Sequence, residues 1–72
     1  MNDVEKAWIR GFCTALAEMH RLRMMLSGGY SSSGVCDVAK AASVSLRKAR
    51  EAGVAGWDLA ELAKAGVPDS AE

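Results

Sequence analysis

Few residues in this chain have the chemistry of a catalyst or a metal ligand. The sequence contains one histidine, His20, and two cysteines, Cys13 and Cys36. Together they supply at most three ligands, one fewer than a closed zinc site requires. No base is evident that could activate either thiol as a nucleophile. We therefore expect a protein that is not an enzyme and has no metal and no cofactor, and we interpret both cysteines as small packing residues.

The densest group of basic side chains lies between residues 47 and 50. It could contact an acidic patch on a protein, form an ordinary solvated helix face, or grip DNA. Nine Lys and Arg residues balance nine Asp and Glu residues, so the chain lacks the basic footprint of a stand-alone DNA-binding protein. Protein contact is therefore the preferred hypothesis. The predicted partner-binding residues are Arg47, Lys48, Arg50, Tyr30 and Trp57.

The basic group belongs to a repeated sequence. The segments LRKAREAGV (46–54) and LAELAKAGV (59–67) align over their full length. In each segment a glycine follows the helical pattern, at the left-handed position that glycine enters most easily. The valine after each glycine can fold back onto the helix, as in a Schellman ending. A fainter copy, AKAASV, spans 39–44 and has Ser43 in the glycine position. Residues 35–67 are therefore predicted to form three short helices joined by tight turns.

The beginnings of these helices also have expected caps. Ser45 and Asp58 each precede a repeat leucine, and their side-chain oxygens can accept hydrogen bonds from free backbone N–H groups. Glu61 follows Asp58 at the spacing of a capping box.

One long amphipathic helix is predicted before the repeats, over residues 3–26. Its apolar face contains the four large residues Trp8, Phe12, Met19 and Leu22. The opposite face contains Lys6, Arg10, Ala17 and Arg21, and His20 falls on the flank. The sequence SGGYSSSG (27–34), rich in Gly and Ser, then predicts a flexible loop.

The large apolar residues predict a dimer. The short helices offer mostly Ala and Val, which supply too little surface to cover Trp8, Phe12, Met19 and Leu22. A second copy of the long helix is the simplest source of that surface, in a two-fold homodimer with self-complementary faces. The alternative is a monomer in which the short helices suffice.

Length and composition predict one all-α domain over 1–72, with residues 68–72 as a tail. Half of the 72 residues are apolar, which suits a globular helical protein. No apolar run approaches the length of a membrane span, and no signal-peptide pattern opens the chain. We expect no membrane contact and a cytoplasmic location, in the host cell if the protein is viral.

The segment DVAKAASVS (37–45) resembles the opening of lactose-repressor-type DNA-binding domains. The resemblance implies a helix-turn-helix in which Val38, Ala39, Ala42 and Val44 are packing residues. It also implies that helix 45–52 presents Arg47, Lys48 and Arg50 to the DNA major groove or phosphates. A small DNA-binding transcriptional regulator is accordingly the alternative function.

A second resemblance covers more of the chain. The helix WIRGFCTALAEMHR (8–21), followed by short L-x-x-A-x-x-A-G-V units, looks like small accessory proteins encoded by tailed phages and prophages of proteobacteria. Those that are understood often bind and block a host protein, such as a defence system or a transcriptional regulator. This resemblance implies a non-catalytic protein-binding module that inhibits or modulates a host protein.

Overall fold

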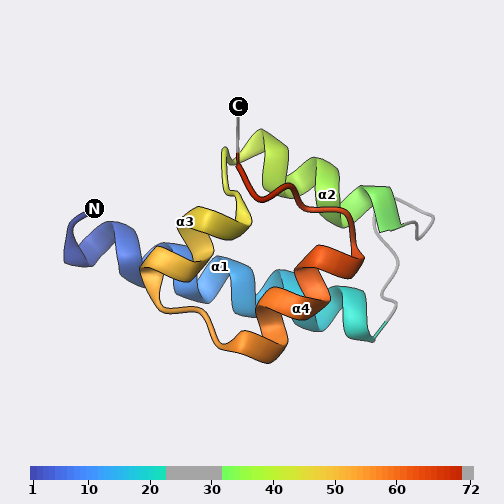
Figure 1. Cartoon of the computed structure of the whole chain (residues 1–72), viewed down its shortest axis with the longest axis horizontal. Coiled ribbons are helices and arrows are strands. Elements are labelled where there is room, and N and C mark those ends of the chain that lie inside the picture. The colour runs from blue at the N-terminus through green and yellow to red at the C-terminus, as the bar shows by residue number, and fades with distance from the viewer. Residues whose placement is uncertain (23–31, 71–72) are drawn as a thin grey trace.

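The computed structural model describes residues 1–22 and 32–70. These residues form four helices and no strand: α1 (Asp3–Arg21), α2 (Ser32–Ala41), α3 (Leu46–Ala52) and α4 (Gly56–Lys64). The prediction of an all-α chain with one long N-terminal helix and three shorter ones is confirmed. Figure 1 shows α1 along the length of the molecule, with α3 and α4 across one side of it. α1 packs mainly against α3 and α4 and less extensively against α2.

The ends of α1 differ in part from the prediction. The Asn2 side chain accepts a hydrogen bond from the Glu5 backbone N–H at 2.8 Å, which caps the first turn. The helix ends at Arg21, before the predicted end at residue 26, and residues 23–26 lie outside the described part. α2 already begins at Ser32, so residues 32–34 are helical and do not belong to the predicted loop. Residues 27–31 of that loop also lie outside the described part.

The three short helices end in the same way, as the repeat predicts. Gly53 and Gly66 have φ values of 97° and 96°, and Ser43 has a φ of 58°. After each of these residues, a valine N–H returns to a carbonyl five residues earlier in the helix. The bonds are Val44 to Ala39 at 2.9 Å, Val54 to Ala49 at 3.0 Å and Val67 to Leu62 at 3.1 Å. All six of these side chains are buried, so each turn returns its valine to the core.

The predicted caps are half correct. The Ser45 side chain accepts a hydrogen bond from the Lys48 backbone N–H at 3.2 Å and caps α3 as expected. Asp58 does not cap α4, because that helix begins two residues earlier, with Ala55 at its N-cap. The capping box of Asp58 and Glu61 is therefore wrong, and both carboxylates bond to α1 instead.

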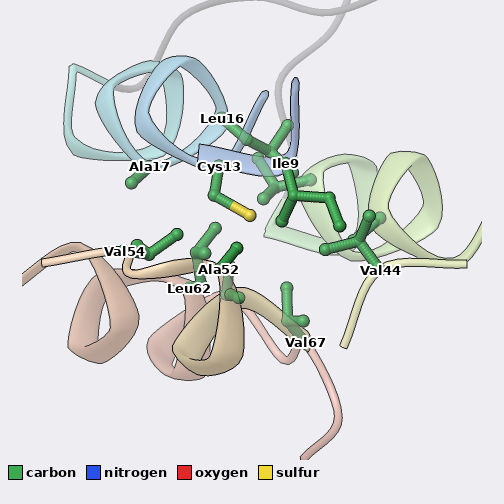
Figure 2. Packing of buried hydrophobic residues seen from close by; sticks show 13 residues of the cluster. Ile9, Cys13, Leu16, Ala17, Val44, Ala52, Val54, Leu62 and Val67 are labelled. Carbon is green, nitrogen blue, oxygen red and sulfur yellow. The ribbon is translucent and has the colours of Figure 1, made fainter. Parts of the chain in front are cut away.

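The core consists of small and medium side chains that point inward from all four helices (Figure 2). Its largest fully buried members are Ile9, Leu62, Val35 and Cys13, none of them aromatic. In Figure 2, Cys13 extends from α1 toward Ala52 and Leu62. Side chains of this size allow the backbones of packed helices to approach closely.

The buried face of α1 is not the one that the sequence predicted. Ile9, Cys13, Leu16, Ala17 and His20 are buried. The predicted apolar face lies about a third of a turn away around the helix. On that face Trp8 and Leu22 are 45% and 60% exposed, while Phe12 and Met19 are half-buried. Trp8 and Leu22 are thus surface residues of the single chain, and their burial in a dimer stays a prediction.

The predicted polar face is corrected for the same reason. Ala17 is fully buried. Arg10 donates a hydrogen bond from Nη1 to the Ala52 carbonyl at 3.0 Å, at the end of α3. Arg21 donates from Nη2 to Asp58 on α4 at 3.0 Å. Because α3 and α4 cover this side of α1, its two arginines bind them.

Substitutions at the helix endings should change stability in opposite directions. A non-glycine residue at a left-handed position costs about 1–2 kcal/mol. Ser43→Gly should therefore raise the free energy of unfolding by about 1 kcal/mol, and Gly53→Ala should lower it by a similar amount. A Cβ at residue 53 would lie 3.7 Å from the Arg10 Cδ, an ordinary contact, so backbone conformation alone causes the loss.

Urea denaturation followed by circular dichroism measures these changes. Gly56→Ala is the control, because Gly56 has no positive φ and open space around its Cα. It should be neutral or slightly stabilising. Equal denaturation midpoints for wild type, Ser43→Gly and Gly53→Ala would contradict the assignment of these helix endings.

Candidate functional site

The predicted basic cluster lies on α3, and two of its three side chains are held within the chain. Lys48 donates from Nζ to the Ser43 carbonyl at 3.0 Å. Arg50 donates from Nη2 to the Asp69 carboxylate at 3.3 Å. Arg47 and Arg50 are exposed, whereas Lys48 is half-buried. The cluster therefore presents two exposed guanidinium groups, one of them beside an acidic side chain.

The C-terminal segment covers the N-terminus of α3. The Leu46 N–H donates to the Pro68 carbonyl at 2.9 Å, and the Arg47 N–H donates to the Asp69 carbonyl at 3.0 Å. Figure 1 shows this segment returning from α4 toward the beginning of α3. Backbone N–H groups in the first turn of a helix commonly contact DNA phosphates. Here these donors are already used, and the segment adds the Asp69 carboxylate at the same place.

α3 carries the basic cluster and follows the segment that resembles a helix-turn-helix. In that motif the helices on either side of the turn pack against each other. In this chain α3 packs on α1 and α4, whereas α2 packs chiefly on α1. The turn between α2 and α3 lies at Ser43, which has a positive φ, and the helix-turn-helix that the resemblance of 37–45 implies stays a prediction.

Trp57 is the most exposed tryptophan of the chain. It lies in the first turn of α4 and is 76% exposed. α4 packs against α3, so the indole and the basic cluster belong to adjoining helices. Tyr30, the remaining predicted partner-binding residue, lies outside the described residues.

A polar network that the sequence analysis missed joins the end of α1 to α4. His20 Nδ1 lies 2.6 Å from Glu61 Oε2, and Arg21 donates to Asp58 at 3.0 Å and also to Glu18. His20 is buried, although a flanking position was predicted for it. The sequence contains one hint of these contacts. Two basic residues end α1, and two carboxylates occur three residues apart in α4. Recognising it required knowing that these helices pack together.

These contacts, together with burial, shift the pKa values of three side chains in and near the network. The hydrogen bond with Asp58, followed by that with Glu18, raises the pKa of Arg21. The hydrogen bond with His20 lowers the pKa of Glu61. Burial, assisted by the Asp58 charge, raises the pKa of Cys13 to about 11. The Cys13 thiol is therefore neutral at pH 7 and, being buried, is a packing group.

The other cysteine has a structural contact as well. Cys36 is buried in α2 and donates a hydrogen bond from Sγ to the Gly66 carbonyl at 3.2 Å. This bond ties α2 to the ending of α4. Within residues 1–22 and 32–70, no three potential metal-ligating side chains come together. Across the same residues, no helix has the length and apolar character needed to span a membrane.

Comparison with known proteins finds no family model, no curated protein and no solved structure that this chain matches.

The pair of His20 and Glu61 should make stability depend on pH. The pKa of Glu61 in the folded chain is below its ordinary value of 4.5. Stabilisation by its ionised carboxylate is therefore complete above the unfolded-state pKa and is lost as pH falls through the folded-state value. We expect Glu61→Gln to be less stable than wild type at pH 7, and the two free energies of unfolding to converge below pH 4.5.

Denaturant titrations between pH 7 and pH 3 measure this convergence. Glu51→Gln, a change at an exposed residue of α3, is the matched control and should follow the wild-type curve. A constant difference between wild type and Glu61→Gln across that pH range would show that the ionised carboxylate does not stabilise the fold.

Proposed function

We propose that this chain is a non-catalytic protein-binding module that modulates a host protein. The observation that carries the proposal is the 76% exposure of Trp57. Tryptophan is among the residues that contribute most to binding energy at protein interfaces. Its large rigid ring loses little conformational entropy on binding and gains a large contact area. Its position in the first turn of α4 holds it on a regular element of the fold.

The exposed basic side chains of the neighbouring helix suggest the chemistry of the partner. Arg47 and Arg50 are exposed on α3, which packs against the helix that carries Trp57. A guanidinium group can form two parallel hydrogen bonds with a carboxylate. The partner surface that fits these groups has an apolar pocket for the indole and acidic side chains near it. Arg50 would exchange its exposed contact with Asp69 for a contact with the partner.

Protein binding accounts for α3 better than DNA binding does. The N–H groups of Leu46 and Arg47, which could hold a phosphate, already bind Pro68 and Asp69. The Asp69 carboxylate at this position would repel a phosphate. The balanced net charge of the chain supports the same choice, because binding to DNA depends on attraction to many phosphates.

The resemblance of residues 8–21 and the repeats to small phage accessory proteins supports a host protein as the partner. Those proteins of that kind that are understood often bind and block a host protein, such as a defence system or a transcriptional regulator. We propose the same setting for this chain. The exposed indole on α4 and the exposed arginines on α3 suit such a role, which requires binding to the partner but no catalysis.

Replacement of Trp57 tests this function. Tagged wild-type protein should recover a specific host protein from a nuclease-treated proteobacterial lysate, and the purified pair should be measured by calorimetry. We expect Trp57→Ala to weaken that complex by more than about tenfold, the effect of an interface hot spot. The change should leave the thermal midpoint close to that of wild type, because the indole makes few contacts within the chain. Lys40→Ala, at an exposed residue of α2, is the control.

Arg47→Ala combined with Arg50→Ala distinguishes the two functions. If the partner is a protein, this variant should weaken the complex, and wild type should not shift duplex DNA at physiological salt. Submicromolar, sequence-specific DNA binding that falls steeply with salt would instead support the alternative function of a transcriptional regulator. Recovery of nucleic acid alone, with no protein after nuclease treatment, would overturn the proposal.

A further inference from the structure

One face of α1 is apolar and is left largely exposed by residues 1–22 and 32–70. This outer face consists of Val4, Trp8, Gly11, Ala15, Met19 and Leu22. Its large residues are far more exposed than core residues, with Val4 at 77%, Leu22 at 60% and Trp8 at 45%. Phe12 borders the face and is half-buried, and its ring lies 5.9 Å from that of Trp8 in an edge-to-face contact. Contiguous exposed apolar surface of this kind typically marks an interaction site.

The outer face has small side chains at its centre and large side chains toward both ends. Gly11 and Ala15, both exposed, lie at its centre. A Cβ added at Gly11 would meet no atom within 4 Å, so the described residues leave this space open. Larger side chains stand on either side, Val4 and Trp8 before the centre and Met19 and Leu22 after it. Small residues at such a position allow another helix to approach closely.

Large and small residues follow one another along this face in nearly the same order from either end of the helix. Val4 and Leu22 are equally far from residue 13, and so are Gly11 and Ala15. A two-fold axis at the level of residue 13 would place Val4 beside Leu22 of a second copy and Gly11 beside its Ala15. Trp8 would then lie near Met19 of the second copy, where a sulfur–aromatic contact is favourable. An antiparallel pair therefore joins large residues to large ones and small to small.

The charges along α1 favour the same orientation. Asp3 and Glu5 lie in the first turn, and Arg21 lies in the last turn, where it bonds Glu18. An antiparallel pair brings Asp3 and Glu5 of each helix toward Arg21 of the other, and it also opposes the two helix dipoles. A parallel pair would place like charges together. Arg21 is available for this attraction in part, since 39% of its side chain is exposed despite its bonds to Asp58 and Glu18.

We propose that this chain forms a two-fold homodimer through the outer face of α1, with the two α1 helices antiparallel. The interface covers Trp8 and Leu22 and brings Gly11 of each copy into contact with Ala15 of the other. This interface adds buried apolar surface to that of the small intramolecular core. The largest fully buried side chains of that core are aliphatic or cysteine. A chain of this length gains stability from such association, because a single small core is marginal.

Sedimentation equilibrium of wild type and Gly11→Leu tests the interface. Wild type should be dimeric at micromolar concentrations, and Gly11→Leu should weaken association by more than about tenfold. The leucine fits the single chain, since the space at Gly11 is open, and it favours the helix more than glycine does. Its thermal midpoint, measured at a concentration where both proteins are monomeric, should therefore be no lower than that of wild type.

Trp57→Ala is the matched control, since it removes an equally large exposed ring from α4. It should leave self-association unchanged while weakening binding to a host protein. Trp8→Ala should have the reverse effect. The dimer and the proposed function can therefore fail separately. A wild-type chain that is monomeric at about 200 μM would overturn the dimer, because an interface that weak corresponds to less than about 5–6 kcal/mol.

Cross-linking distinguishes the orientation. In an equal mixture of Val4→Cys and Leu22→Cys under mild oxidation, an antiparallel pair should give a disulfide between the two variants. Each variant alone should give little covalent dimer. The native Cys13 and Cys36 are buried and should contribute little background. Efficient dimerisation of Val4→Cys alone would indicate a parallel pair, and dimerisation unaffected by Gly11→Leu would place the interface elsewhere. Either result would overturn the proposal.

Discussion

The close approach of α3 and α4 to α1 is the constraint on which this fold depends. Cys13 and Ala17 are fully buried on α1, and Cys13 extends toward Ala52 of α3 (Figure 2). Dense packing of such residues leaves no space for an indole or a phenyl ring between the helices. The aromatic residues of α1 therefore lie outside its buried face, with Phe12 half-buried at the edge of the core. The same constraint explains why Trp8 is on the surface although it is among the largest apolar residues of the chain.

The repeated helix endings make this packing possible with few residues. Each ending turns the chain sharply after a short helix and places one valine in the core. Every turn therefore reverses the chain and also adds a buried side chain. Ser43 shows that the geometry is imposed by the whole fold, because it adopts a left-handed conformation without being glycine. The Cys36 bond to the Gly66 carbonyl then links one of these endings to another helix.

Polar contacts fix the arrangement at the edge of the core. Arg10 binds the end of α3, while His20 and Arg21 bind carboxylates of α4. These contacts hold the two short helices at defined positions along α1. Large apolar side chains remain exposed on the outer face of α1, at Val38 of α2 and at Trp57 of α4. We propose that the outer face of α1 binds a second copy of the chain and that Trp57 binds a different protein.

The sequence by itself determined the helical class, the start of α1, the cap at Ser45 and the three helix endings. These features depend on local chemistry, such as the tolerance of glycine for positive φ and the capping oxygen of serine. The tertiary structure decided which face of α1 is buried. Hydrophobicity favoured the face with Trp8, whereas packing against alanine-rich helices required the face with Ala17. The roles of Asp58 and Glu61 depended on the same choice, because their partners on α1 became close only when that face turned inward.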